Sequence, residues 1–517
     1  MLKLLCLNLP KNNNLKIEVS ILKYKTRAAI LVRPFFMFFF ISLSPALYAQ
    51  FSFTEASKAK YQEVLKLKSV TGLAHTQQDQ NLNGINIYIE HLAETIKMLV
   101  EENPALLEKY KQHSEVAEIK VSGLNPHSPY YLFVIGEIKL QRAFVKLKFG
   151  EEIGSMWELR LAYKTLAENA IKHPDFLPNN KSIGLLKILI GSIPEKYTWI
   201  VNLVGMEGSV NEGLEMLKTL SESETPFASE AKILRFAILN FILGKETGSE
   251  KAVKDLYLSD KDNLLYTFLY ASVCMKNAHS EEALCILENS PDYSSSYLNF
   301  AYLHMMLGDI YLQKGLYTKA FYLYKNFLNE YRGGNFKKEA YYKIFLCYWL
   351  NNEDNKAIQI LPQIIKEGNA IYDGDKYALY FAENRDFSDK NIMKARLAID
   401  GGFFNTAEDI LEKLSPKDFH SQKDEIEYYY RFARLFHKTG KLQEAIKFYK
   451  KTIDLSGDKK LYFAPNAALQ LGYIYRYQKN KEQAVFYFEK ALTYKDYYYK
   501  NGIDNKARGA LNEIKKI

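Results

Sequence analysis

Residues 301–332 read AYLHMMLGDIYLQKGLYTKAFYLYKNFLNEYR, and this stretch decides the fold class of the chain. Its apolar residues recur every three or four positions on both sides of Lys314-Gly315, the pattern of two amphipathic helices joined by a turn. Small residues, Gly308 and Ala320, stand where two helices must approach closely. Such a helix pair cannot cover its apolar face alone, so we expect it to stack on neighbouring pairs. Larger apolar residues fill the rest of the predicted seam: Leu307, Tyr311, Tyr317, Tyr324 and Phe327.

The same small position recurs along the second half of the chain. We place it at Ala252, Ala283, Ala320, Ala357, Ala407, Ala445 and Ala484. Matching small residues on the first helices of the pairs are Gly308, Ala395, Ala433 and Gly472. The longest interval leaves room for a loop or one extra helix around residues 376–383, just after Asp373-Gly374-Asp375, which we interpret as a turn. The order and spacing resemble tetratricopeptide repeats, which implies an all-α, helical-hairpin solenoid wound as a right-handed superhelix.

A more specific resemblance lies in the last two pairs. YYYRFARLFHKTGKLQEAIKFYKKTI (428–453) and YFAPNAALQLGYIYRYQKNKEQAVFYFEKALTYKDYYYK (462–500) resemble the end of the tetratricopeptide repeat protein 39 group and its inclusion-body clearance relatives. The elements that carry it are Phe463-Ala-Pro465, Leu471-Gly472, Ala484, Tyr494-Lys495, Gly184, Ile193-Pro194, Leu203, Gly205, Gly208, Gly213 and Leu214. The resemblance implies a helical fold without catalytic activity. That family is intracellular, so its cellular role is not carried over.

The residues before the repeats form longer helices, which we expect over 83–102, 105–121, 130–149 and 156–171. The apolar stretch 183–220 is divided by Lys187 and Pro194-Glu195-Lys196, and neither half is long enough to span a bilayer, so we predict a buried helical hairpin. The predicted organisation is a signal peptide over 1–49, an N-terminal helical region over 50–225 with longer helices, and the repeat array over 226–517.

The leader combines a basic segment, Lys23-Tyr-Lys-Thr-Arg27, with an apolar run from Ala28 to Leu43. Small residues follow, so we predict a secretory signal cleaved after Ala49. The ending ALYAQ looks like signals common in the Bacteroidetes, and we expect export to the periplasm or to the outer membrane of a Gram-negative cell. An uncleaved anchor is the alternative. A start codon assigned too far upstream would explain the long basic region.

Charge and cysteine content exclude several classes of function. Residues 1–49 hold seven basic residues and one acidic residue, so most of the formal charge of +9 belongs to the leader and only +3 to the rest. That balance gives no case for nucleic-acid binding. Three of the four cysteines lie beyond the leader: Cys274, Cys285 and Cys347. A disulfide between Cys274 and Cys285 within one hairpin is one interpretation, and buried thiols in the helix seams are the other.

No motif for a metal, a cofactor or a nucleophile occurs, so we predict neither a catalytic site nor a cofactor. The candidate site is instead a protein-binding groove on the first helices of the last two repeats, where basic groups and tyrosines alternate. We predict that it holds a peptide carboxylate or an acidic segment. Its predicted residues are Tyr430, Arg431, Arg434, His437, Lys438, Asn466, Tyr473, Arg476 and Tyr477, flanked by Glu427 and Leu469.

Three functions are consistent with this pattern. The first is an exported scaffold or adaptor that binds a protein or peptide partner in the cell envelope. The second is a structural subunit that docks on an outer-membrane complex through its N-terminal helices, and this one predicts an exposed apolar patch before Pro226. The third is a hydrolase with an unrecognised site, which requires titratable residues that converge in one deep pocket.

Overall fold

The computed structural model describes residues 51–69, 82–193, 207–243, 249–291, 296–385, 387–419 and 421–515. The predicted signal peptide and the predicted turn at Pro194-Glu195-Lys196 lie outside these residues. Within them the regular structure is helical, as predicted, and β-pairing is limited to one bridge between Lys68 and Tyr297. No helix in this described part is long and apolar enough to cross a membrane.

The chain divides into two compact units. The first comprises the described residues up to Gln62, within Val70–Thr95 and within Glu108–Arg235, and the second comprises Glu63–Ser69, Ile96–Leu107 and the chain from Phe236 onward. The sequence-based boundary at Pro226 concerns where regular repeats begin, and it stays a prediction.

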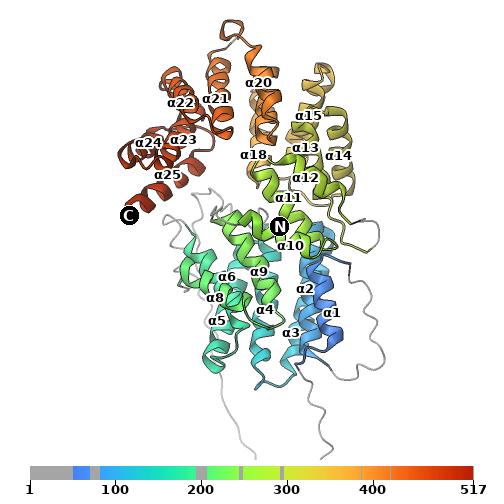
Figure 1. Cartoon of the computed structure of the whole chain (residues 1–517). Coiled ribbons are helices and arrows are strands. Elements are labelled where there is room, and N and C mark those ends of the chain that lie inside the picture. The colour runs from blue at the N-terminus through green and yellow to red at the C-terminus, as the bar shows by residue number, and fades with distance from the viewer. Residues whose placement is uncertain are drawn as a thin grey trace, which may run out of the picture. The chain divides into compact units, whose positions relative to one another are not determined.

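Antiparallel helices build the first unit (Figure 1). The last residues of three of these helices belong to the second unit. Its helices are α1 (Glu55–Leu65), α2 (Gly84–Glu101), α3 (Leu107–Ser122), α4 (Pro129–Lys148), α5 (Glu152–Lys172), α6 (Asn179–Gly191), α8 (Val210–Ser221) and α9 (Ala228–Ala237). Gly184 of α6 and Gly213 of α8 let these two helices touch, because a Cβ on Gly213 would lie 2.4 Å from the carbonyl oxygen of Gly184. The stretch 183–220 therefore contributes two helices packed on each other.

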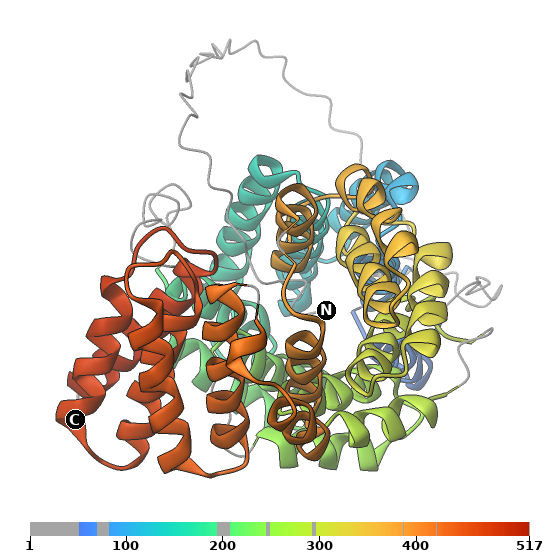
Figure 2. The same cartoon turned by 90° about the horizontal axis from the view of Figure 1, so that it is seen from above.

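Hairpins in chain order build the second unit, from the green and yellow helices to the red ones in Figure 2. Its helices are α10 (Ser249–Ser259), α11 (Leu264–Lys276), α12 (Ser280–Glu288), α13 (Tyr302–Gln313), α14 (Tyr317–Glu330), α15 (Lys337–Leu350), α16 (Asp354–Ile358), α17 (Leu361–Lys366), α18 (Asp373–Asn384), α19 (Lys390–Gly401), α20 (Phe404–Glu412), α21 (Gln422–Lys438), α22 (Leu442–Ser456), α23 (Phe463–Tyr477), α24 (Lys481–Thr493) and α25 (Lys500–Lys515). Short helical turns lie at Pro104–Leu106, Ile238–Ile242 and Pro416–Asp418.

The first helices of successive hairpins form one continuous layer. Helix α19 packs on α15 and α21, α21 packs on α23, and α23 packs on α25, while each also packs on the second helix of its own hairpin. Of the two alternatives for the interval around 376–383, a loop or an extra helix, the structure has the helix, α18, which packs on α15. Stacked hairpins with an inner and an outer layer are the architecture of a helical solenoid.

The small residues occupy the contacts predicted for them, with one exception. A Cβ on Gly308 would lie 2.6 Å from the ring of Tyr324, and one on Gly472 would lie 2.5 Å from the ring of Phe488. Six of the seven alanines are completely buried: Ala283, Ala320, Ala357, Ala407, Ala445 and Ala484. The seventh, Ala252, is exposed, and the buried position of α10 belongs to its neighbour Val253. The assignment of Ala252 to the helix seam was wrong.

The cysteines of the described chain are free thiols. Cys274 and Cys347 are buried, as expected for apolar thiols in helix seams, but Cys285 is exposed. Of the two interpretations, the disulfide is not formed and the burial of all three thiols is only partly confirmed.

Candidate protein-binding surface

Helices α21 and α23 carry the predicted groove residues, and both belong to the inner layer of first helices. The start of α21 is set by Ser421, whose Oγ accepts a hydrogen bond from the backbone N–H of Asp424. Side chains on one face recur at every third or fourth position of each helix. The predicted residues therefore extend along the helix axes, and their surroundings differ from one end to the other.

At the beginning of α21 the predicted residues are part of the folded core. Arg431 donates from Nε to Oε1 of Glu427 over 3.0 Å and from Nη2 to the hydroxyl of Tyr462 over 2.9 Å. Arg431 is 5% exposed and Glu427 2%. Tyr430, also 2% exposed, packs against Tyr449 and Phe463. Arg431 therefore joins α21 to α23 inside the protein, and its charge is compensated there.

A cluster of tyrosines surrounds this ion pair and is drawn from successive inner helices. Tyr342 of α15 contacts Tyr377 of α18 at a ring separation of 5.5 Å, and Tyr377 stacks on Tyr499 at 6.1 Å. Tyr499 also contacts Tyr462 at 5.5 Å. Burial raises the pKa of Tyr342, Tyr462 and Tyr499, and Arg396 of α19 lies close enough for its charge to oppose that rise. This part of the inner layer is filled by the chain itself.

At the other end of the two helices the predicted residues reach solvent. We call Arg434, Lys438, Tyr473, Arg476 and Tyr477 the basic strip. Tyr477 is 80% exposed, Lys438 and Arg476 are exposed, and Arg434 and Tyr473 are half-buried.

One charged side chain of the basic strip, that of Arg476, already binds an acid. The guanidinium of Arg476 donates from Nη1 to Oε2 of Glu513 of α25 over 2.7 Å, and it lies 5.2 Å from the ring of Tyr473. A carboxylate is thus held by a guanidinium that also lies over a tyrosine ring, which combines a charge-assisted hydrogen bond with a cation–π contact.

Two further predicted residues turn toward the protein. His437 is half-buried with Nδ1 3.2 Å from the hydroxyl of Tyr449, and burial together with the charges of Arg434 and Lys438 lowers the pKa of His437 to about 4. It is therefore neutral at pH 7. The side-chain oxygen of Asn466 accepts a hydrogen bond from Gln470 of its own helix over 3.2 Å. Neither residue adds charge to the basic strip.

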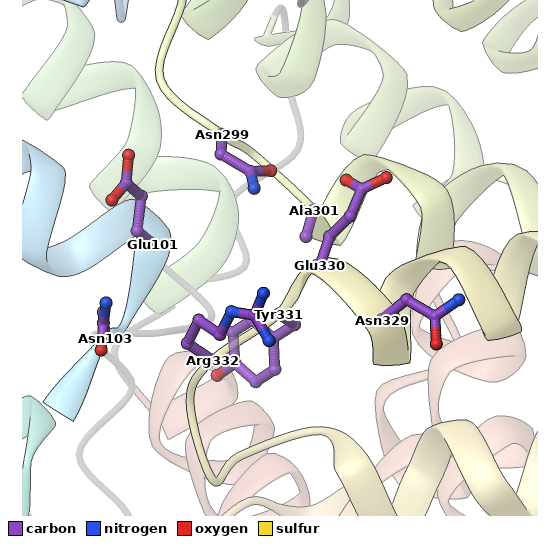
Figure 3. A pocket seen from close by; sticks show the side chains of 8 residues that line it. All are labelled: Glu101, Asn103, Asn299, Ala301, Asn329, Glu330, Tyr331 and Arg332. Carbon is purple, nitrogen blue, oxygen red and sulfur yellow. The ribbon is translucent and has the colours of Figure 1, made fainter. Parts of the chain in front are cut away.

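Two other polar sites in the second unit have no recognisable signal in the sequence. A cavity of 190 Å³ lies between the end of α2, the segment before α13 and the end of α14 (Figure 3). Its lining residues are Glu101, Asn103, Asn299, Ala301, Asn329, Glu330, Tyr331 and Arg332. It is small and mostly polar, and most of its side chains reach solvent.

The second site brings together Glu250 of α10 with His279 and Glu282 at the start of α12, with candidate ligand atoms within 4.8 Å of one another. Each carboxylate is already engaged. Asn277 donates to Glu250 over 2.7 Å, and Glu282 accepts from Tyr270 and pairs with Lys254. The arrangement is a polar network at the start of α10 and α12.

Comparison with known proteins identifies the repeats. Residues 426–459 and 465–497 match the family model described as tetratricopeptide repeat, and these ranges hold α21 to α24. No curated protein sequence matches the chain. Residues 426–497 thus contain two tetratricopeptide repeats, a kind of stacked helical hairpin whose concave face commonly serves as a binding surface.

Several solved structures are distantly similar. The tetratricopeptide repeat domain of P58(IPK) is 16% identical, with 83% of this chain and 99% of that one covered and a TM-score of 0.20. A monomeric mutant of IFIT1 with Gppp-AAAA is 15% identical, with coverage of 84% and 94% and a TM-score of 0.33. The human IFIT1 dimer with PPP-AAAA is 14% identical, with coverage of 86% and 96% and a TM-score of 0.25.

Proposed function

We propose that this protein is an exported scaffold that binds an acidic segment of a protein partner at the basic strip. The observation that carries the proposal is the placement of Lys438, Arg476 and Tyr477 at the solvent-exposed end of the two repeats that match the family model. Three cationic groups, those of Arg434, Lys438 and Arg476, lie on this strip beside the rings of Tyr473 and Tyr477.

The binding mechanism requires no covalent chemistry. Carboxylates of the partner would accept charge-assisted hydrogen bonds from the guanidinium and ammonium groups, and its apolar atoms would pack on the two tyrosine rings. Glu513 would be displaced from Arg476 or would remain beside an incoming acid. The resemblance of the last two hairpins to the tetratricopeptide repeat protein 39 group supports a role without catalysis.

Export to the cell envelope is the second part of the proposal. It is supported by the basic segment, apolar run and small residues that end at Ala49. N-terminal sequencing of the mature protein tests it: we expect the chain to begin at Gln50 in a periplasmic or outer-membrane fraction. A chain that keeps its leader in the cytoplasm would contradict export and leave the basic strip to be tested separately.

Site-specific photo-crosslinking in living cells tests the basic strip. A photoreactive residue at position 477 should capture a partner, whereas one at Tyr322 of α14, which is also well exposed at 62%, should not. The variant K438E/R476E should reduce the crosslinked product at least tenfold. As a matched control, K447E/K451E reverses two exposed charges on the outer helix α22 and should leave it unchanged. Equal capture by both pairs of variants would reject the basic strip.

A second function, docking of the N-terminal helices on an envelope complex, is favoured by an apolar stripe on α5. Ile153, Trp157 and Leu161 are 63%, 57% and 45% exposed and recur at every fourth position, so they share one face of the helix. An exposed apolar face of this kind is typical of an interaction surface. The full-length variant W157K/L161K should lose co-sedimentation with envelope complexes, whereas L258K, at a residue 54% exposed on α10, should not.

A further inference from the structure

The segment before α25 extends from the last hairpin to α18, which precedes it by more than a hundred residues in sequence. We call Tyr498 and Tyr499 the tyrosine arm. The ring of Tyr498 lies 5.2 Å from Tyr380 and 5.7 Å from Tyr377, both of α18. The ring of Tyr499 contacts Tyr377 and also Tyr462, the residue just before α23. The arm therefore lies across the inner layer and contacts both α18 and the start of α23, which are not consecutive helices.

The surface under the arm, formed by Tyr377, Tyr380 and Tyr462, is referred to here as the tyrosine wall. Tyr462 is held by its hydrogen bond from Arg431, and Tyr377 by its ring contact with Tyr342. The wall is thus positioned by the repeats themselves and does not require the arm to define it. Its outer edge is open, because Tyr380 is 39% exposed.

The arm is anchored at both ends and attached only weakly in between. Tyr497 is buried in the last hairpin, and Lys500 donates from Nζ to the carbonyl oxygen of Tyr494 over 2.9 Å. Between the arm and α18, the charge of Asp373 lies close enough to act on Tyr498, and the tyrosine rings contact one another. Such contacts can be exchanged for those of another aromatic side chain without leaving a buried polar group unpaired.

The backbone of the arm and of the residues just before it is also strained. Asp496, which precedes the arm, and Tyr499 within it have φ of +56° and +71°, in the left-handed region that residues other than glycine rarely adopt. Conformations of this kind persist when the surrounding contacts hold them, and they cluster at ligand clamps and switch segments. Release of the two rings from the wall would remove what holds Tyr499 in this conformation.

We propose that the tyrosine wall is a docking surface for aromatic side chains of a protein partner, and that Tyr498 and Tyr499 occupy it in the free protein. The partner segment would carry two adjacent or near-adjacent aromatic residues, because the wall accepts two rings at once. The inference rests on the proposed function only in that the competitor is a protein. The wall lies at the opposite end of α21 and α23 from the basic strip, so a segment with aromatic residues followed by acids would bind both.

A peptide copied from the chain provides the probe. A fluorescein-labelled peptide with the sequence of residues 494–502, YKDYYYKNG, is titrated into the full chain and into the variant Y498S/Y499S, and fluorescence anisotropy is measured. We expect the variant to bind the peptide at least tenfold more tightly than the wild type, because its wall is empty. A peptide with serine in place of the two arm tyrosines should bind to neither protein.

Three further variants make the result specific. Y498F/Y499F keeps the rings and should behave like the wild type. Y322S removes an exposed tyrosine of α14 and should also behave like the wild type. Y377S/Y380S added to Y498S/Y499S should abolish peptide binding. Independently of any peptide, amide hydrogen exchange over residues 373–384 should accelerate in Y498S/Y499S and stay unchanged in Y498F/Y499F.

Two results would overturn the proposal. Equal peptide binding by the wild type and by Y498S/Y499S would show that the arm does not compete for the wall. Absence of binding to a Y498S/Y499S variant whose circular dichroism matches the wild type would show that the wall is not a docking surface. Neither result depends on the basic strip, and loss of crosslinking in K438E/R476E would stand in either case.

Discussion

Gly308 illustrates how a single missing side chain sets the distance between two helices. A Cβ there would lie 2.6 Å from Tyr324, whose ring is completely buried and whose hydroxyl is bonded to Asp309. Gly308→Ala gains about 1 kcal/mol of helix propensity but loses about 1–3 kcal/mol to overpacking, so we expect a net loss of stability. Gly509 of α25 has nothing within 4 Å, and Gly509→Ala should gain about 0.5–1 kcal/mol. Urea unfolding measures the change in unfolding free energy that each substitution causes. A change of the same sign in both variants would contradict the close contact at Gly308.

His91 of the first unit couples stability to pH. It is 3% exposed, with Nδ1 2.6 Å from the side-chain oxygen of Gln141 and Nε2 2.8 Å from the hydroxyl of Ser114. Burial, aided by the charge of Arg142, lowers the pKa of His91 to about 4 from its ordinary 6.5. Between these values the unfolded chain binds the proton and the folded chain does not, so stability falls as the pH drops from 6.5 toward 4.

The pKa difference of His91 corresponds to about 3 kcal/mol by pH 4. In His91→Gln this contribution is absent, because glutamine does not titrate. The difference in unfolding free energy between wild type and variant should therefore shrink as the pH is lowered from 7 to 4. Parallel pH profiles for the two proteins would show that His91 is not the group responsible.

Helices of the first unit meet at one buried ammonium group. Lys181 of α6 is 2% exposed, and its Nζ lies 2.8 Å from Glu137 of α4 and 3.2 Å from Glu230 of α9. It also donates to the hydroxyl of Tyr88 of α2 over 2.8 Å, and Tyr61 of α1 donates to Glu230. The network thus links five helices, and burial raises the pKa of Glu137 even though Lys181 opposes the shift.

Removing only the cation should lower the free energy of unfolding more than removing all the charges of the network. Lys181→Met leaves the buried carboxylate of Glu137 and the partly buried one of Glu230 without this counter-charge, so we expect a loss of about 3–5 kcal/mol. The triple variant K181M/E137Q/E230Q removes the charges together and should recover part of that loss. Denaturant unfolding of the full chain followed by circular dichroism compares them. A triple variant less stable than K181M would show that the two carboxylates stabilise the fold even without Lys181.

The stacking of hairpins and the extra helix α18 were predictable, because both depend on local periodicity and on the interval between small residues. The role of Asp375 was not. It lies in a segment interpreted as a turn, but it begins α18 and its buried carboxylate accepts hydrogen bonds from the backbone N–H groups of Phe336 and Glu339 at the start of α15. That contact depends on how two helices pack, which local sequence does not specify.

The sequence was sufficient to place the candidate groove residues on two inner helices. It was not sufficient to predict which of these residues are exposed. Helical spacing places Arg431 and Arg434 on the same side, whereas only packing decides that Arg431 is enclosed by Tyr462. One signal was available, since Glu427 and Arg431 are four residues apart and such pairs form within a helix. The contact of Tyr498 with α18 had no local signal, because it depends on the curvature accumulated over several hairpins.

Because the second unit is built from stacked hairpins, each hairpin packs mainly on the adjacent ones and the unit has no single central core. The C-terminal helix α25 provides a test of this description. Helix α25 packs on α23 and α24, where it buries Ile503, Ala507, Ala510 and Ile514. Deleting residues 500–517 should lower the local opening free energy of α23 and α24 by at least about 2 kcal/mol, since each buried apolar side chain contributes about 1.5–3 kcal/mol. In a solenoid each repeat is stabilised only by those beside it, so α13 to α15 should keep their protection. Hydrogen exchange measured helix by helix distinguishes the two regions. The full-length variant I503S/I514S should lower protection in the same way as the deletion. The control K506S/N512S changes two residues on the exposed face and should have no effect. Loss of protection along the whole second unit would mean that it unfolds as a single cooperative body, and the nearest-neighbour description would have to be given up.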